Sequence, residues 1–437
     1  MDRVAHADAR ALKAMGARKV AVVGGGWAGC AAAVQAVEAG HEVTLFEMAG
    51  HLGGRARRVE LDGTALDNGQ HILIGAYGET LALMRRVGVA PDEALLRMPL
   101  RVMYPDGSGL LLAEGPALRT FPLAVLRYPG WSARERLALL AAAGGWALRG
   151  FGCRAGLSVS QLCAALPQKV RADFIEPLCV AALNTPAREA CAQVFLRVLR
   201  DALFSGPGSS DLLLPRSDLS ALLPDAAARW LEAAGATLRL SRRVQRLEAD
   251  AGGWRVDGER FDAVVLAASP VEAARLVAPI DAGWAAQARA LRFEPIVTVY
   301  AQADGATLPL PMMALREGPG APAQFVFDHG RLGGPAGRLA FVVSGASGWL
   351  ARGSEATAQA VLAQAREVLP AGTAPRLRLL RTLVEKRATF LCTPGLARPP
   401  AAIAPGLQAA GDYVAGPYPA TLEGAVRSGK QAARALT

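Results

Sequence analysis

The chain has 437 residues, of which 52% are hydrophobic, 20% are charged and 6% are aromatic, and its formal net charge is +10. This composition, with a mean hydropathy of +0.23, excludes a disordered chain, and the length predicts two or three structural units. Only five of the 48 basic residues are lysine, so codon bias explains the positive charge as well as an anionic partner does. Because the arginines are spread along the chain, nucleic-acid binding is not expected.

The sequence gives no sign of a membrane span or of a metal site. The longest uncharged run, residues 20–37, contains three consecutive glycines and is better explained by a strand, a turn and a helix. Charged residues crowd the first ten positions, so we expect no signal peptide and a cytoplasmic protein. The six cysteines and five histidines form neither a Cys-x-x-Cys pair nor a metal-ligand spacing, which predicts no zinc and no dithiol centre.

The first predicted elements form a strand–helix–strand unit. Residues 19–23 are an apolar run typical of a buried parallel strand, a helix is predicted from about 28 to 39, and a second strand covers 42–46. The sequence 24–29 between the first strand and the helix is a G-x-G-x-x-G. Glu47 follows the second strand and can accept hydrogen bonds from an adenosine ribose. In this order the motif predicts a dinucleotide site.

Each residue of the glycine-rich turn has a predicted task. Gly24 permits the tight turn, Gly26 lets the backbone approach a pyrophosphate, and Gly29 lets the helix pack on the strand. Trp27 and Ala28 open the helix, whose N-terminus offers free N–H groups and partial positive charge to the phosphates.

The next segment distinguishes FAD from NAD. Residues 51–55 read His-Leu-Gly-Gly-Arg, so Gly53 and Gly54 bring backbone to the same pyrophosphate and Arg55 brings a guanidinium. The chain here resembles the superfamily of flavin-containing amine oxidases and phytoene desaturases. That resemblance implies FAD as the cofactor.

Later segments extend the resemblance. Residues 243–247 look like the family strand whose valine, here Val244, touches adenine through its backbone. A further strand is predicted over 262–269, which places Ala268 beside the cofactor. No second G-x-G-x-x-G follows any strand, and without a Cys-x-x-Cys pair the chain is not a two-nucleotide disulfide reductase. Reducing equivalents are therefore expected from an outside electron donor, whose identity stays open.

The C-terminal segment is similar to the last flavin-contacting strand and helix of that family. A strand over 407–411 ends in Gly411 and Asp412, and a helix follows Thr421 and Leu422. In the family the aspartate meets the ribitol-phosphate side of the flavin. The helix N-terminus points at the flavin pyrimidine, where its dipole stabilises negative charge.

These matches predict an α/β fold: a three-layer, Rossmann-like FAD-binding domain with a parallel sheet and an inserted α+β substrate domain. The FAD-binding domain is discontinuous, over residues 18–75, 210–275 and 390–437. The substrate domain comprises 76–209, expected to be mostly helical, and 276–389, which contains the strand-like runs 296–301, 324–327 and 339–344.

One helical segment has two open interpretations. Residues 121–131 mix aromatic side chains with arginine, and residues 137–148 are uncharged and bounded by Arg136 and Arg149. This run is too short to span a bilayer but suits an interfacial segment whose arginines reach the headgroups. It fits a buried helix of the substrate domain equally well. A peripheral contact with the inner membrane is therefore left open.

A closer resemblance covers the chain from end to end. The segments 66–77, 176–186, 210–216, 386–390 and 411–425 look like those of the hydroxysqualene dehydroxylases, squalene-associated flavoproteins of the same superfamily. The resemblance implies an apolar isoprenoid substrate, hydroxysqualene, and reductive removal of its hydroxyl group to give squalene in hopanoid synthesis. A flavin amine oxidase and a carotenoid-type desaturase are the alternatives.

Breaking the allylic C–O bond requires a proton donor, because hydroxide is a poor leaving group. His71 and Asp67 are the first candidates, since they lie in the run Asp-Asn-Gly-Gln-His just after the flavin segment. Alternatively this run, including Gln70, packs beside the flavin and only positions it. Tyr418 is a further candidate that could equally be a packing residue. Cys392 lacks the local pattern of a flavin-linking cysteine, so noncovalent FAD is expected.

Overall fold

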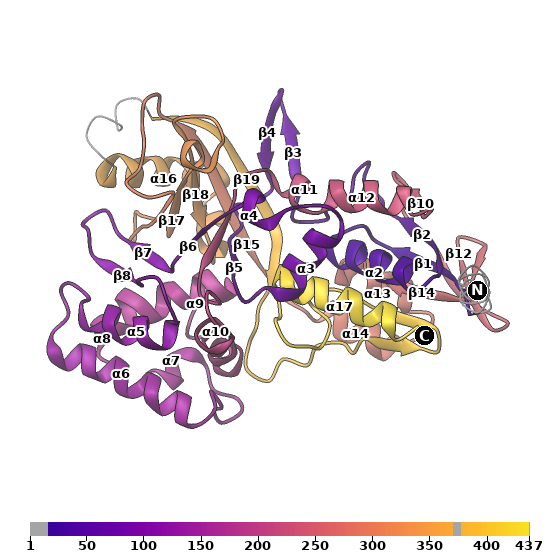
Figure 1. Ribbon diagram of the computed structural model, residues 1–437, viewed down its shortest axis with the longest axis horizontal. Coiled ribbons are helices and arrows are strands. Elements are labelled where there is room, and N and C mark those ends of the chain that lie inside the picture. Colours follow the sequence, from indigo (N-terminus) through magenta and orange to yellow (C-terminus); the bar gives the residue numbers. More distant parts are fainter. Residues whose placement is uncertain (1–15, 370–376, 437) are drawn as a thin grey trace, which may run out of the picture.

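The computed structural model describes residues 16–369 and 377–436 (Figure 1). The prediction of no signal peptide rests on the first ten positions, which lie outside the described residues. Three regions are visible. A parallel-sheet region lies on the right of Figure 1, an antiparallel-sheet region at the upper left, and a helical region, residues 117–204, at the lower left.

Within residues 16–369 and 377–436, the parallel-sheet region is built on six strands. Their order is β10 (Thr237–Arg239), β2 (Glu42–Phe46), β1 (Lys19–Val23), β14 (Ala263–Leu266), β21 (Leu407–Ala409) and β20 (Ala402–Ala404). All neighbours are parallel except β21 and β20. The predicted strands over 19–23 and 42–46 are confirmed with these bounds, as is the Rossmann-like parallel sheet.

Layers cover both faces of this sheet because successive side chains of a strand point to opposite sides. Val20 and Val22 of β1 pack on one face, and Ala21 and Val23 pack on the other. The first face is covered by α2 (Trp27–Glu38), α11 (Leu219–Leu222), α12 (Pro224–Ala233) and α17 (Leu422–Arg434). The second is covered by β11 (Leu247–Asp250), β12 (Gly253–Val256), β13 (Glu259–Phe261), α13 (Pro270–Val277) and α14 (Ala282–Arg289). The predicted three-layer arrangement is confirmed.

The antiparallel-sheet region carries five strands in the described residues. Their order is β16 (Met312–Ala314), β17 (Phe325–Asp328), β18 (Arg338–Val343), β15 (Phe293–Gln302) and β19 (Arg378–Phe390). The helix α16 (Ser354–Val368) packs on one face, next to α15 (Ser347–Leu350), and η2 (His329–Leu332) follows β17. The three strand-like runs of the sequence correspond to β15, β17 and β18.

The helical region has its own core, which includes Trp131, Trp146 and Phe195. Its elements are α5 (Ala117–Leu126), α6 (Ala133–Leu148), α7 (Val159–Leu162), α8 (Gln168–Val170), the π-helical turn η1 (Arg171–Ile175), α9 (Glu176–Leu183) and α10 (Ala192–Phe204). In the part of the chain that the structure describes, no helix is long and apolar enough to cross a bilayer.

Smaller elements connect the three regions. These are the hairpin β3 (Arg58–Leu61) and β4 (Thr64–Asp67), the sheet of β5 (Leu73–Ile74), β9 (Leu212–Pro215) and β6 (Leu95–Met98), the hairpin β7 (Arg101–Met103) and β8 (Gly109–Leu111), and the helices α3 (Gly78–Arg86) and α4 (Pro91–Ala94). Residues 76–209 therefore contain strands as well as the expected helices.

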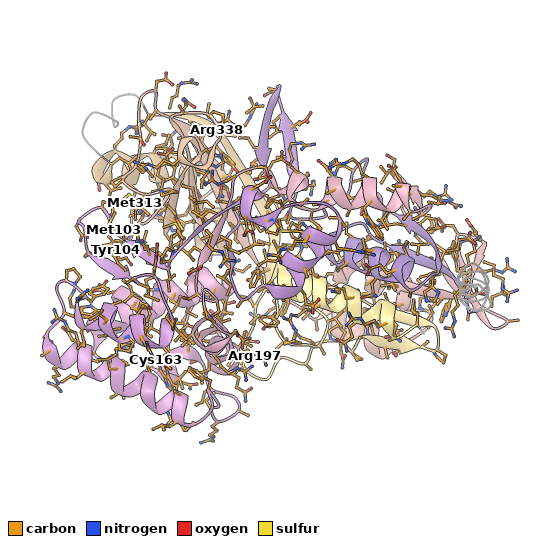
Figure 2. The ribbon with its side chains drawn as sticks, in the orientation of Figure 1. Met103, Tyr104, Cys163, Arg197, Met313 and Arg338 are labelled. Carbon is orange, nitrogen blue, oxygen red and sulfur yellow. The ribbon has the colours of Figure 1, made fainter. Side chains whose placement is uncertain are left out.

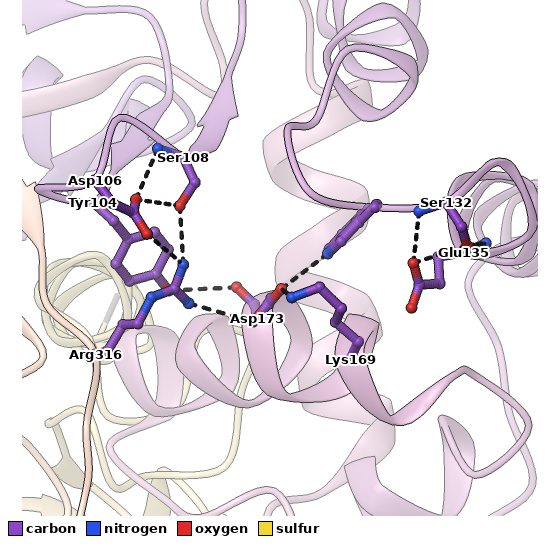
Figure 3. Close-up of polar contacts among 9 residues, drawn as sticks. Tyr104, Asp106, Ser108, Ser132, Glu135, Lys169, Asp173 and Arg316 are labelled. Atoms are coloured by element: carbon purple, nitrogen blue, oxygen red, sulfur yellow. Dashed lines mark hydrogen bonds and ion pairs between the residues drawn. The ribbon is translucent and has the colours of Figure 1, made fainter.

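The β7–β8 hairpin joins the helical region to the antiparallel sheet. Met103 packs in one hydrophobic cluster with Met313 of β16, and Figure 2 labels both side chains. The Arg316 guanidinium lies 4.3 Å from the centre of the Tyr104 ring and donates hydrogen bonds to Asp106 and to Asp173 of η1 (Figure 3). Charge pairing and ring stacking thus fix the position of the helical region against the sheet.

The structure corrects one predicted strand. Residues 243–246 belong to no strand, and β11 starts only at Leu247. Side chains, not a neighbouring strand, bind this backbone: Arg275 donates to the carbonyls of Val244 and Gln245, and Asp257 accepts the N–H of Gln245 at 2.8 Å. The family resemblance predicts a strand here, but these side chains occupy backbone groups that a neighbouring strand would otherwise bind.

Candidate functional site

The glycine-rich turn between β1 and α2 is as tight as its sequence predicts. Gly24 has a φ of +107°, and a Cβ added to it would lie 2.5 Å from the carbonyl oxygen of Ala267. A Cβ on Gly29 would lie 1.8 Å from the carbonyl oxygen of Gly24. Only glycine fits either position, so helix and strand can pack this closely only with these residues.

A cavity of about 620 Å³ opens beside this turn, at the junction of the three regions. Its volume lies in the range of small-molecule sites, about 300–1,000 Å³. Most of the predicted cofactor residues line it: Gly24, Gly26, Trp27, Ala28, Glu47, Gly53, Gly54, Arg55, Gln70, Val244, Ala268, Gly411, Asp412, Thr421 and Leu422. Gly29 lies behind the wall, where it permits the helix packing that its motif implies.

Glu47 lies at the carboxyl end of β2, with its carboxylate already held by backbone. One oxygen accepts the N–H of Gly25 at 2.7 Å, and the other accepts the N–H of Ala49 at 2.8 Å. These bonds fix the carboxylate at the edge of the cavity. The orientation is consistent with the predicted contact to a ribose hydroxyl, for which a carboxylate has spare lone pairs.

Unsatisfied polar atoms in the wall test whether a flavin dinucleotide fits. Among the described residues, the Nε of Arg57 and the hydroxyl of Tyr413 are buried without a hydrogen-bond partner, and both residues line the cavity. A buried unpaired donor is costly unless a ligand satisfies it. With the α2 N-terminus lining the same cavity, an anionic phosphate group would satisfy Arg57, so the residues present fit FAD. The sequence analysis missed Arg57, although it stands two positions after Arg55.

Arg55 connects the segment after β2 with β19 and with the segment after β21. It forms an ion pair with Asp412 and donates to the carbonyl oxygen of Ala388 at 2.7 Å. The cavity also receives the start of α17, where the Thr421 hydroxyl caps the helix by accepting the N–H of Gly424 at 3.0 Å. This helix terminus offers partial positive charge to a bound anion.

His71 lies in the cavity wall with a defined tautomer. Its Nδ1 lies 3.0 Å from the carbonyl oxygen of Gly69, which can only accept, so Nδ1 carries the hydrogen and the neutral ring has a bare Nε2. Burial is the main cause that lowers the pKa of His71, and the Arg55 charge adds to it. The neutral ring can therefore accept a hydrogen bond, and its protonated form is a stronger acid than ordinary imidazolium.

Glu385 of β19 is a cavity carboxylate that the sequence analysis missed. One of its oxygens accepts from the Asn68 side chain at 3.0 Å, and the other accepts the N–H of Arg387 at 3.0 Å. Within the described residues it forms no ion pair, whereas Glu272 pairs with Arg243 and Asp412 with Arg55. A signal was available, because Glu385 directly precedes the segment 386–390 used for the resemblance.

The structure does not bring the other two predicted catalytic residues to this cavity. Asp67 lies behind the wall, where its carboxylate accepts the N–H of Leu219 at 2.8 Å, and burial raises its pKa to about 7. Tyr418 lines a second, smaller cavity of about 240 Å³. The Arg427 guanidinium lies 4.7 Å from its ring centre, and the Arg197 guanidinium lies 5.5 Å away.

The wall that the antiparallel sheet and the end of α9 contribute is mainly apolar, although Thr298, Ser344 and Asn184 also belong to it. Its apolar residues are Ile296, Phe325, Phe327, Val342, Leu383 and residues 180–183. The Asn68, His71 and Glu385 side chains also belong to the wall of this cavity. The site can hold a dinucleotide at one end and an apolar molecule at the other.

Three comparisons with known proteins agree with this geometry. The chain matches the family described as Flavin containing amine oxidoreductase over residues 27–437. It is 27% identical to a protein named hydroxysqualene dehydroxylase from Sinorhizobium fredii, over 95% of this chain and 97% of the relative. A shorter match, 44% identical over 18% of this chain and 16% of the relative, is to a zeta-carotene desaturase of Synechocystis sp..

Solved structures show the same fold. An oxidoreductase from Methanosarcina mazei has a TM-score of 0.73 at 18% identity, covering 94% of this chain and 99% of that one. The family match covers nearly the whole chain, including the C-terminal strand and helix of the cofactor end. The chain therefore belongs to the flavin containing amine oxidoreductase family and is an FAD-dependent oxidoreductase.

Proposed function

We propose that this oxidoreductase removes the hydroxyl group of hydroxysqualene reductively and releases squalene, a step of hopanoid and other isoprenoid synthesis. The relative from Sinorhizobium fredii, which aligns over 95% of this chain, supports the proposal by its name. The structural observation that carries it is the two-ended cavity, with cofactor residues at one end and apolar residues at the other. A thirty-carbon polyene requires such an apolar wall.

In this reaction the C–O bond breaks, the oxygen takes a proton and leaves as water, and the carbon takes a hydride. Reduced FAD, when bound, supplies that hydride. The cavity residues have to exclude other water, because water would add to an allylic cation. Ile296, Phe325 and Leu383 line that wall and serve this purpose. Electrons come from a separate donor, since no second dinucleotide motif follows a strand of this chain.

We assign the proton transfer to His71. It lines the cavity, and its lowered pKa makes the protonated ring a strong donor to a leaving hydroxyl. The Gly69 carbonyl holds Nδ1, which leaves Nε2 to face the reaction. Asp67 and Tyr418 lie outside the cavity wall, and we give them structural tasks.

We assign Glu385 to stabilising positive charge on the substrate. Its carboxylate lines the cavity and has no cationic partner among the described residues, so its charge is available to an allylic cation. The Asn68 amide donates to it and also to the Arg55 carbonyl, which holds the carboxylate in a fixed place. Fixed charge of this kind lowers a barrier without reorganisation during the reaction.

We expect FAD to be bound without a covalent link. Cys392 is buried, its pKa is raised to about 12 mainly by burial, and it is not among the residues that line the cavity. A thiol with this pKa is a poor nucleophile at neutral pH. Acid precipitation of the FAD-loaded protein should release all flavin into the supernatant, and flavin that stays with the precipitate contradicts the expectation.

Product identification tests the reaction. The FAD-loaded protein is reduced anaerobically, mixed in separate samples with hydroxysqualene, phytoene and a set of amines, and the products are identified by mass spectrometry. Squalene from hydroxysqualene, with stoichiometric oxidation of the flavin, supports the proposal. A second set of samples uses oxidised protein in the presence of air. There, desaturated phytoene favours the carotenoid-type desaturase suggested by the short Synechocystis match, and hydrogen peroxide from amines favours an amine oxidase.

A further inference from the structure

The helix α6 (Ala133–Leu148) has an outer face without polar side chains. Its exposed positions after the first turn are Leu137, Ala141, Gly144 and Leu148, which follow one another at helical spacing and form one stripe. Leu137 is 61% exposed and Leu148 is 92% exposed. A surface helix of a globular protein normally presents charged or polar residues on its exposed face. Burial of Leu139 and Trp146 elsewhere on α6 therefore does not explain the apolar residues of this stripe.

The neighbouring helix α5 (Ala117–Leu126) also carries exposed leucines. Leu118, Leu123 and Leu126 are 61%, 41% and 47% exposed, and α5 contacts α6. Among the described residues, six of the eleven large apolar side chains that are exposed fall between positions 111 and 148. Such a concentration marks an interaction surface, whereas single exposed leucines need no explanation. We call these six residues the leucine face: Leu111, Leu118, Leu123, Leu126, Leu137 and Leu148.

Arginines surround the leucine face. Residues 111–154 contain six arginines, no lysine and two glutamates. The arginines are Arg119, Arg127, Arg134, Arg136, Arg149 and Arg154, and all but Arg136 are exposed. None of the six forms an ion pair with a carboxylate in the part of the chain that the structure describes. Elsewhere on the surface arginines commonly do, as Arg243 does with Glu272.

We propose that the leucine face and its arginines form a docking surface for an anionic phospholipid bilayer, with α5 and α6 lying in the plane of the membrane. Leucines enter the acyl region, and arginines at the helix ends reach the lipid phosphates. The charge pattern favours a lipid surface over a second copy of this chain, because two such faces would bring unpaired arginines together. At 16 residues, α6 is shorter than the roughly 20 residues of a span.

The docking surface belongs to the same region as a wall of the cavity. The helix α9 (Glu176–Leu183), whose residues 180–183 line the cavity, packs in the core of the helical region together with Leu139 and Trp146 of α6. Arg316 and Asp173 tie this region to the antiparallel sheet (Figure 3). If the helical region contacts a bilayer, the region that touches lipid also contributes α9 to the apolar wall of the cavity. The inference specifies a partner for the proposed function, but its binding test needs no substrate.

Vesicle co-sedimentation of the FAD-loaded full chain tests the proposal. We expect binding to vesicles of phosphatidylcholine with phosphatidylglycerol, and at least tenfold weaker binding to phosphatidylcholine alone. The double variant Leu137→Ser, Leu148→Ser should lower affinity for the anionic vesicles by at least tenfold, since each leucine loses its transfer into the acyl region. The variant Arg134→Gln, Arg149→Gln should lower it about tenfold or more, and the loss should shrink in high salt.

Leu240→Ser is the matched control, because Leu240 is 40% exposed and lies in the parallel-sheet region. It should bind vesicles as the unchanged chain does. Flavin absorbance and the urea unfolding midpoint show that each variant is folded. The proposal is overturned if the unchanged chain stays in the supernatant with anionic vesicles, or if Leu240→Ser weakens binding as much as the double leucine variant. It is also overturned if the leucine substitutions only abolish a dimer seen by analytical ultracentrifugation. Failure of squalene formation with intact vesicle binding would contradict the proposed reaction alone.

Discussion

The two ends of the large cavity are built in different ways. The cofactor end is made by short contiguous stretches, of which the turn from Gly24 to Gly29 and the run from Gly53 to Arg57 are the main ones. The reaction end joins His71 to Glu385, which are more than three hundred positions apart, and to the end of α9. The shape of the cofactor end therefore depends on local backbone geometry. The shape of the reaction end depends on how the three regions pack together.

This difference has a consequence for substitutions. At the cofactor end a side chain that blocks the backbone should abolish the site, because no neighbouring residue can move. At the reaction end a change of one functional group should slow the chemistry and leave FAD in place.

The largest effect is expected for Gly29→Val. Its Cβ would lie 1.8 Å from the carbonyl oxygen of Gly24, so α2 cannot pack on β1. We expect at least a hundredfold loss of FAD affinity, or no folded protein, measured by flavin fluorescence and circular dichroism. Gly144→Ala is the control, because a Cβ there meets nothing within 4 Å. It should keep FAD and stabilise α6 by up to about 1 kcal/mol. Normal FAD binding by Gly29→Val would contradict the packing argument.

His71→Gln should lower the rate of flavin oxidation by hydroxysqualene by about 10²–10⁴-fold, the usual contribution of a general acid. The measurement is a single turnover at saturating substrate. Burial lowers the pKa of His71 below its ordinary value, so the protonated fraction grows as pH falls. The rate of the unchanged chain should therefore rise toward acidic pH and level off below the lowered pKa. The Gln variant should lack this rise, and an unchanged rate would rule out the assignment.

Glu385→Gln should slow the same step about a hundredfold, because a fixed charge near a developing cation is lost while the hydrogen bond from Asn68 can persist. FAD affinity should stay the same. Glu272→Gln is the matched control, since this cavity carboxylate pairs with Arg243 and Arg275. It should leave the single-turnover rate unchanged. Equal slowing by both variants would show that the cavity's overall charge matters and not the position of Glu385.

Arg57→Gln should weaken FAD binding about ten- to a hundredfold, because a hydrogen bond to a charged group contributes about 1.5–3 kcal/mol. Isothermal titration of the apoprotein with FAD measures this. The neighbouring Arg58→Gln is the control: Arg58 pairs with Asp218 and Asp225 and does not line the cavity. The rate per bound flavin should not change in either variant. If Arg57→Gln binds FAD with unaltered affinity, the buried Nε of Arg57 does not contribute to FAD binding.

The sequence predicted most of the cofactor end because its signals are local. Strand β1, the glycines and Glu47 follow one another within thirty positions, and each has a steric or hydrogen-bonding task that only its residue type performs. The reaction end was predicted in part. His71 lines the cavity, but Glu385 reaches it only through the pairing of β15 with β19, which no local pattern reveals.

The errors have the same physical origin. Residues 243–247 resemble a strand of the family, yet Arg275 and Asp257 bind backbone groups of this segment in place of a neighbouring strand. Asp67 stands four positions before His71 and looks equally suited to proton transfer. In the structure the two side chains diverge, because Asp67 ends β4 and turns toward the N–H of Leu219 at the start of α11. Sequence proximity gives no information on that direction.

Asp67→Asn should produce the smallest effect on catalysis, and it should change stability instead. Burial raises the pKa of Asp67 to about 7, compared with about 3.9 in an unfolded chain. Between these values the folded state keeps a proton that the unfolded state has lost. Stability is therefore fully present below about pH 4 and decreases as pH rises toward 7. Asparagine cannot ionise, and its oxygen can still accept the Leu219 N–H.

Urea unfolding from pH 4 to pH 8 should then show two results. The variant should match the unchanged chain at pH 4 and exceed its unfolding midpoint at pH 8, while the single-turnover rate with hydroxysqualene stays the same. A large loss of rate would indicate that Asp67 is the proton donor. It would also contradict the conclusion that Asp67 lies outside the part of the site that reacts. An unchanged pH dependence of stability would show instead that the folded protein keeps this carboxylate ionised, with Leu219 and Arg58 compensating for its burial.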